Sequence, residues 1–134
     1  MYAFNYEKPG AVADAERQLR DLDDPKLLAG GQTLIPTMKQ RLAMPSDLID
    51  IADIADLKGI AVEGDRLVVG AAEKHADVAA SETVRGAIPA LAHLASGIGD
   101  PHVRHRGTMG GSLANNDPSA CYPAACLGLG ATIH

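Results

Sequence analysis

The sequence predicts an α+β fold, in which a small βαβαβ subdomain precedes part of a second α+β subdomain with antiparallel strands. Two observations lead to this prediction. Short apolar segments alternate with helical patterns as far as about residue 55, which is typical of a small parallel sheet. Beyond that point, two segments with the sequence pattern of β-strands flank Gly64 and Asp65 and indicate a hairpin with a tight turn. We therefore expect one subdomain over residues 1–55 and another over residues 56–134.

The first subdomain is predicted to contain three strands, over residues 3–6, 26–29 and 47–51. Its first helix is predicted from apolar residues that recur on one face, namely Val12, Ala15, Leu19 and Leu22. The second helix is expected to begin after Thr33, which can serve as its N-cap, and to end at Pro45. The predicted buried stripe of this helix consists of Ile35, Met38 and Leu42.

The second subdomain is predicted to begin with the hairpin, whose strands cover residues 60–63 and 66–70. A helix is then indicated by the spacing of Ile88, Leu91, Leu94 and Ile98. A long loop is expected over residues 102–119, because Gly, Asn, Asp and Pro are frequent there. A short helix over residues 120–127 and an apolar strand that begins at Ala131 complete the pattern. Since the sequence ends at the start of a strand, we expect this subdomain to be incomplete at its C-terminus.

Composition and charge narrow the possible functions. The chain carries 17 acidic and 12 basic residues, and this net charge of −5 argues against nucleic acid as a partner. No apolar stretch reaches the roughly 20 residues that span a bilayer, and the N-terminus lacks the pattern of a signal peptide. No metal site is predicted, because the two cysteines lack a zinc-binding spacing. We therefore expect a cytoplasmic protein without a transmembrane segment.

The first candidate site is the segment Ala29-Gly30-Gly31-Gln32-Thr33-Leu34, which lies between a predicted strand and a predicted helix. Glycine permits positive φ and lets a ligand approach the main chain. The start of the helix offers unpaired N–H groups, which can bind phosphate without a basic side chain. A Gly-Gly turn before a helix is also common as a purely structural turn. The segment alone does not decide between a phosphate-binding turn and a structural one.

The second candidate site is the glycine-rich segment over residues 106–118, which reads RGTMGGSLANNDP. Three glycines in five positions, interleaved with hydroxyl side chains, can form a nest of N–H groups around an anion. The Asn and Asp residues that follow suit the hydroxyl groups of a ribose or ribityl chain. Neither segment matches the dinucleotide fingerprint GxGxxG or a P-loop, so a standard NAD enzyme or an NTPase is disfavoured. We expect His75 and His93 to be surface or helix-edge residues, and we predict no general acid or base.

Taken together, the two segments resemble those of the FAD-binding medium subunit of the molybdenum hydroxylases, which include carbon monoxide dehydrogenase, xanthine dehydrogenase and aldehyde oxidase. The resemblance extends over essentially all 134 residues and is carried by AGGQTLIPTMKQRLAMPSDLIDI and VRHRGTMGGSLANNDPSACYPAACLGLGATI. It implies a fold of the vanillyl-alcohol-oxidase or PCMH type. It also implies FAD as the cofactor, with both glycine segments in contact with it.

Carried over by position, the resemblance implies two sets of FAD-binding residues. The first set wraps the pyrophosphate and consists of Ala29, Gly30, Gly31, Gln32, Thr33 and Leu34. The second set contacts the phosphates and the ribityl and flavin end, and consists of Thr108, Gly110, Gly111 and Ser112, with Asn116 and Asp117 as outer members. Four residues after Asp117, the family commonly has a carboxylate that contacts the flavin nucleotide, whereas this sequence has Cys121. This thiol could lie beside the cofactor or be a buried structural cysteine.

The resemblance implies an electron-transfer role. The expected complex contains a large molybdopterin-binding subunit and a small [2Fe–2S] subunit, and its electrons pass from the iron–sulfur clusters through FAD to an external acceptor. Because the family's chains continue beyond this length, we expect the 134 residues alone to bind FAD weakly or not at all. Two alternatives remain: a truncated scaffold subunit that does not bind FAD by itself, or a site for another nucleotide.

Overall fold

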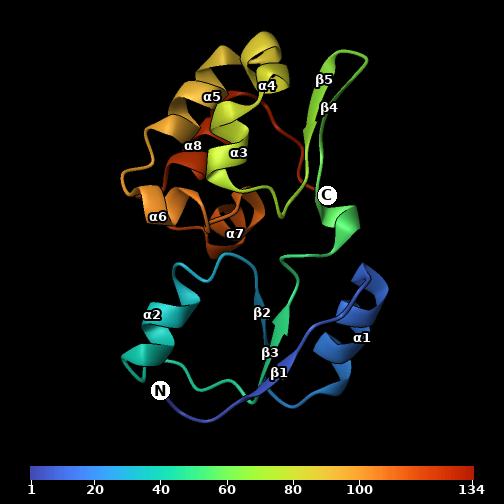
Figure 1. Cartoon of the computed structure of the whole chain (residues 1–134), viewed down its shortest axis with the longest axis vertical. Helices are drawn as coiled ribbons and strands as arrows, with labels where there is room; N and C mark the ends of the chain where they lie inside the picture. Colours follow the sequence, from blue (N-terminus) through green and yellow to red (C-terminus); the bar gives the residue numbers. More distant parts are fainter.

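The computed structural model describes residues 1–134 as two parts stacked along the long axis of the molecule (Figure 1). The lower part contains a parallel three-stranded sheet in the order β1-β3-β2. Its strands are β1 (Asn5–Glu7), β2 (Pro25–Leu28) and β3 (Asp47–Asp50). Two helices connect them, α1 (Val12–Asp21) and α2 (Leu34–Lys39), on opposite sides of the sheet in this view. The predicted βαβαβ unit is confirmed.

The central strand β3 carries the core of the lower part. Leu48 and Ile49 are almost fully buried, as expected for a strand that has a neighbour on each side. Ile49 packs with Ala15 of α1 and with Ile54, which follows the strand. This cluster has three buried residues, and Met38 and Leu48 are buried outside it, so the apolar core of the lower part is small.

The upper part combines a two-stranded antiparallel sheet with six helices. The short 3-10 helix η1 (Ala55–Leu57) leads into the predicted hairpin of β4 (Ile60–Glu63) and β5 (Arg66–Val69). The helices are α3 (His75–Ala80), α4 (Glu82–Ala87), α5 (Pro89–Ser96), α6 (Pro101–Arg104), α7 (Met109–Asn115) and α8 (Cys121–Gly128). Their core consists of Val78, Val84, Leu91, Ala92, Ala95 and Tyr122. The predicted α+β class is therefore confirmed.

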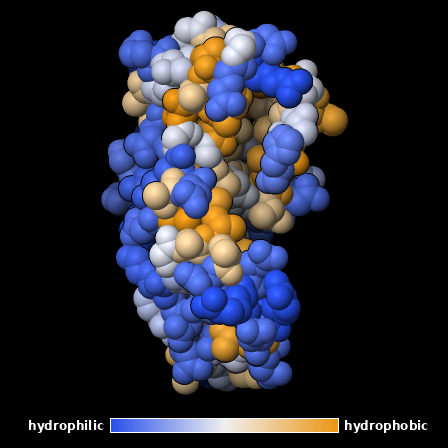
Figure 2. Space-filling view, turned by 90° about the vertical axis from the view of Figure 1, so that its right-hand side faces the viewer, coloured by the Kyte–Doolittle hydropathy of each residue, from blue (hydrophilic) through white to orange (hydrophobic).

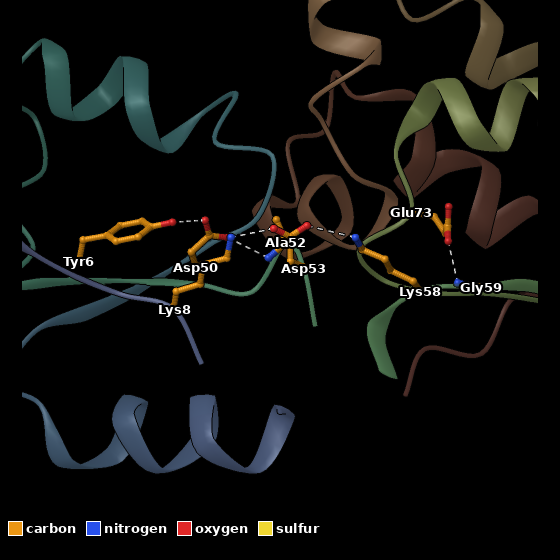
Figure 3. A network of polar contacts seen from close by, with 8 residues as sticks. All are labelled: Tyr6, Lys8, Asp50, Ala52, Asp53, Lys58, Gly59 and Glu73. Atoms are coloured by element: carbon orange, nitrogen blue, oxygen red, sulfur yellow. Dashed lines mark hydrogen bonds and ion pairs between the residues drawn. The ribbon is translucent and has the colours of Figure 1, made fainter. Parts of the chain in front are cut away.

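A row of polar contacts runs along the end of the lower sheet toward the hairpin (Figure 3). The Tyr6 hydroxyl donates to Asp50, and the Asp53 carboxylate pairs with both Lys8 and Lys58, at 2.8 and 3.2 Å. These two lysines hold the pKa of Asp53 below its ordinary value. Lys58 follows η1, so the contacts connect the sheet to the segment that enters the upper part.

Several predicted elements are wrong in extent. The predicted loop over residues 102–119 contains most of α6 and all of α7, because Asp100 and Thr108 cap these helices with their side chains. Helix α2 ends at Lys39 instead of Pro45, since Arg41 adopts a left-handed conformation with φ of 61°. Leu42 is consequently 75% exposed and does not belong to a buried stripe.

The predicted strand at Ala131 is absent, because residues 131–134 have no regular structure. Ile133 and Leu127 are among the most exposed large apolar residues of the chain. The side of the molecule that bears the hairpin is mainly hydrophilic in its lower part, while hydrophobic residues gather in its middle and upper parts (Figure 2). None of the helices has the length and hydropathy needed to cross a membrane.

Candidate functional site

The first glycine segment turns the chain from β2 into α2. Gly31 has a φ of +71°, a conformation that side-chain-bearing residues rarely adopt, and this explains a glycine at that position. The Gln32 side chain folds back over the turn and donates to the Gly30 carbonyl at 3.1 Å. Thr33 stands at the predicted N-cap position, but its side chain accepts no capping hydrogen bond. The start of α2 therefore lacks a side-chain cap.

Five consecutive backbone N–H groups in this segment have no backbone partner. The amides from Gly30 to Leu34 donate to no backbone carbonyl, and the first bond of the following turn is from Ile35 to Gly31. Backbone N–H groups are strong donors, and those at the start of a helix are satisfied by a cap, by water or by a ligand. A run of five free donors at one turn is therefore suited to an acceptor from outside the chain, such as a phosphate group.

The second glycine segment differs, because its N–H groups already have partners inside the protein. Met109 donates to the Glu73 carbonyl and Gly110 to the Ala71 carbonyl, both at 2.9 Å. Gly111 donates to the Thr108 hydroxyl at 3.1 Å, which caps α7. The prediction that this segment forms a nest of free N–H groups is therefore wrong. Its amides fasten α7 to the chain that enters α3.

The glycines of the second segment allow close packing. A Cβ on Gly107 would lie 2.6 Å from Nε2 of His75, and a Cβ on Gly110 would lie 2.7 Å from the Ala71 side chain. The His75 amide also donates to the Gly107 carbonyl at 3.0 Å. His75 is 5% exposed, so the prediction of a surface residue is wrong for it. Its neighbours explain the burial, because its ring lies 5.2 Å from that of Tyr122 in the upper core.

Burial also changes the pKa of the His75 side chain. Desolvation lowers the pKa of His75, because the charged imidazolium is disfavoured away from water. Neither Nδ1 of His75 nor the Tyr122 hydroxyl has a hydrogen-bond partner within the chain. The neutral imidazole ring of His75 thus packs against Gly107 from inside the upper part.

The two glycine segments meet where the lower and upper parts join. A Cβ on Gly30 would lie only 2.6 Å from the Cα of Gly107, so the two main chains are in direct contact. A Cβ on Gly111 would lie 3.9 Å from that of Ala29. The predicted pair of glycine segments is thus brought together, although the segments are far apart in the sequence.

A cavity of about 320 Å³ opens beside this junction. It is lined by Gly30, Gly31, Gln32, Ile35, Pro36, Lys39 and Arg106. Its volume is near the lower end of the roughly 300–1,000 Å³ that is typical of ligand pockets. Of the first predicted set, Gly30, Gly31 and Gln32 line the cavity and Ala29, Thr33 and Leu34 do not, while Arg106 contributes from the start of the second segment.

Two of the lining residues are cationic, Lys39 and Arg106. Arg106 begins the second candidate segment, whereas Lys39 lies outside both predicted sets. Both side chains are exposed, and neither forms an ion pair with a carboxylate of the chain. No Asp or Glu lines the cavity. The sequence held a partial signal, since Arg106 directly precedes the glycines, but nothing local related it to Lys39.

None of the second predicted set lines this cavity. Thr108 is buried and caps α7, and Asn116 ends the helix in a left-handed conformation with φ of 48°. The Asp117 carboxylate accepts from the Ser119 amide at 2.8 Å. Cys121 is exposed at the start of α8, so the alternative of a buried structural cysteine is wrong. Gly110, Gly111 and Ser112 belong to α7 and position it against its neighbours.

Comparison with known proteins gives a consistent set of relatives. A family model described as the FAD binding domain in molybdopterin dehydrogenase matches residues 2–134. The chain is 44% identical over 125 residues to the carbon monoxide dehydrogenase medium chain of Hydrogenophaga pseudoflava. It is 37% identical over 127 residues to the nicotine 6-hydroxylase medium subunit of Paenarthrobacter nicotinovorans. These alignments cover 92% and 95% of this chain, but only 44% and 45% of the relatives.

Solved structures agree with the sequence relatives. A structure of carbon monoxide dehydrogenase from Hydrogenophaga pseudoflava matches with a TM-score of 0.90 at 45% identity, and covers 92% of this chain and 44% of that chain. Quinoline 2-oxidoreductase from Pseudomonas putida 86 matches with a TM-score of 0.88 at 35% identity, over 91% of this chain and 43% of that chain. The chain thus spans less than half the length of the proteins that it resembles.

Proposed function

The chain belongs to the family of FAD-binding domains of molybdopterin dehydrogenases, and we propose that its part in the medium subunit is to hold the diphosphate of FAD between its two glycine segments. The observation that carries this proposal is the run of free amides from Gly30 to Leu34 beside a cavity that also contains Lys39 and Arg106. These groups fit a diphosphate, because they offer donors and positive charge and no carboxylate.

Each predicted set of residues then has a different task in the proposed site. The amides of residues 30–34 donate to phosphate oxygens, and Ala29 places this turn against the second segment. Thr108, Gly110, Gly111 and Ser112 hold α7 in place, so that Arg106 lines the cavity from the second segment. Asn116, Asp117 and Cys121 lie beyond α7, where we propose that they face the ribityl and flavin end.

The redox chemistry is supplied by FAD when it is bound, while the protein binds and orients the cofactor. No side chain of this chain is required as a general acid or base. We propose that the parent complex is an oxidoreductase, in which a large molybdopterin-binding subunit and a small [2Fe–2S] subunit join this flavin-binding subunit. Electrons would pass from the iron–sulfur clusters to an external acceptor by way of this subunit.

We also propose that residues 1–55 and 56–134 act as two subdomains that share the site. The relatives are more than twice as long as this chain, so the proposed contacts of the isoalloxazine ring lie largely outside the 134 residues. FAD binding by this chain alone would then depend on the diphosphate and would be weak.

Isothermal titration of the 134-residue chain with FAD, ADP and riboflavin tests this proposal. Because the diphosphate provides the contacts, FAD and ADP should bind with similar and modest affinity, while riboflavin should not bind. Stoichiometric FAD retained through purification would contradict the weak binding. Equal binding of riboflavin would contradict the assignment of the diphosphate, and binding of none of the three would favour the alternative of a scaffold subunit.

A further inference from the structure

We propose that Lys39 and Arg106 form a two-cation clamp that selects a diphosphate over a single phosphate group. This inference rests on the proposed function, and it assigns residues that determine the specificity of that site. Both side chains line the same cavity of about 320 Å³. They belong to different parts of the molecule, since Lys39 is the last residue of α2 and Arg106 lies in the turn between α6 and α7.

Nearly all the other cationic side chains of the chain are occupied elsewhere. Those that pair with carboxylates are Lys8, Arg17, Arg20, Lys26, Lys58, Arg66 and Arg85. Arg104 donates to the carbonyls of Ile98 and Gly99, and Arg41 lies over the Tyr2 ring. The remaining cations are Lys39, Lys74 and Arg106, and two of these three line one cavity.

The charge around the cavity strengthens this argument. The whole chain has a net charge of −5, which repels a free anion at long range. The cavity nevertheless contains two cations and no carboxylate, so its local charge is opposite to that of the chain. Free backbone amides alone would serve a single phosphate or a diphosphate, whereas two separate cations give each phosphate group of a diphosphate its own counter-charge.

The positions of the two cations also imply how the ligand sits. Three of the residues with free amides, Gly30, Gly31 and Gln32, line the cavity just before α2 starts, and Lys39 ends the same helix. Arg106 lies across the junction, next to the glycine that contacts Gly30. A single phosphate bound at the amides would engage fewer of these groups than a diphosphate does. The second phosphate group should therefore add affinity only while both cations are present.

The experiment titrates inorganic pyrophosphate and inorganic phosphate into the chain, into Lys39→Met and Arg106→Met, and into the double variant. Each single change should weaken pyrophosphate binding about tenfold or more, as expected for the loss of one charge-assisted hydrogen bond. The double variant should bind the two anions equally. Lys74→Met is the matched control, because it removes a cation that does not line the cavity, and it should bind pyrophosphate like the parent chain. Lys39→Arg should restore most of the affinity.

A thermal unfolding curve of each variant confirms that the exposed substitutions leave the fold intact. If the parent chain binds FAD and pyrophosphate but the double variant binds pyrophosphate as tightly, the clamp is wrong and the proposed function stands. If the parent chain binds neither FAD nor pyrophosphate, both proposals are wrong. If it binds pyrophosphate but not FAD, the variants still decide the clamp, while the proposed function is wrong.

Discussion

Gly30 is the residue at which the two parts of the molecule come closest. Its main chain touches that of Gly107, and the space that a side chain would need is filled by backbone atoms. Backbone cannot rotate away as a flexible side chain can, so even a methyl group must separate the two segments. Gly10 provides a comparison, because a Cβ at that position would meet no atom within 4 Å.

We expect Gly30→Ala to destabilise the protein by about 1–3 kcal/mol, the usual cost of overpacking. Gly10→Ala should change the free energy of unfolding by less than about 0.5 kcal/mol, as for most surface substitutions. Urea denaturation of both variants measures the difference. Equal stability of the two variants would show that the two main chains at the junction can move apart at little cost in free energy.

His75 gives the chain a specific dependence on pH. Burial lowers the pKa of His75 in the folded state, so the unfolded chain binds a proton more readily than the folded chain. The free energy of unfolding should therefore rise as the pH increases from the folded pKa to about 6.5, and His75 should add no further change above that. The slope from one such group cannot exceed about 1.4 kcal/mol per pH unit.

Urea denaturation between pH 5 and 8 measures this slope, and His75→Phe should reduce it. The exposed His93 is the matched control, since His93→Gln should leave the slope unchanged. A slope that persists in His75→Phe would assign it to other groups.

At the scale of elements, the two helices that follow the glycine segments begin in different ways. Thr108 caps α7 through its hydroxyl, whereas Thr33 occupies the same position at α2 without a capping bond. Thr108→Ala should cost about 1 kcal/mol of stability, as is typical for the loss of an N-cap. Thr33→Ala should cost much less. Thermal unfolding of the two variants tests this difference, which would be refuted by equal losses.

The same elements show how far the sequence could predict the fold. Strands β2 to β5 agree with the prediction to within one residue at each end, because they have clear apolar patterns between turn residues, whereas β1 begins two residues later than predicted. Helices α3, α4, α6 and α7 were missed, since four to seven residues are too few to establish a helical period. For α6 the sequence did contain a signal, a capping Asp100 followed by Pro101.

The candidate site was predictable only in part, for a related reason. The glycines of both segments could be recognised from local sequence. The partners that occupy the amides of the second segment could not, because Ala71 and Glu73 lie far from it in the chain. Lys39 and Arg106 likewise converge only through the packing of the lower part on the upper part.

At the scale of the whole molecule, stability is unevenly divided. The lower part has a core cluster of three fully buried residues, while the upper cluster has six. A chain of about 55 residues buries only roughly 60% of the surface that it exposes when unfolded, and it is marginally stable alone. We expect residues 1–55 expressed alone to lack a cooperative thermal transition in circular dichroism. A sharp transition in that fragment would show that the lower part is an independent domain.

The contrast between the two glycine segments also has a kinetic consequence. Amides without a hydrogen-bond partner exchange their protons with water quickly, whereas bonded amides must wait for the structure to open. In the free chain, residues 30–34 should therefore take up deuterium at once, and residues 109–112 should do so slowly. A bound diphosphate would slow the first group and leave the second almost unchanged. Deuterium uptake by residues 30–34 thus reports whether the site is occupied, and this measurement does not require a ligand that absorbs light.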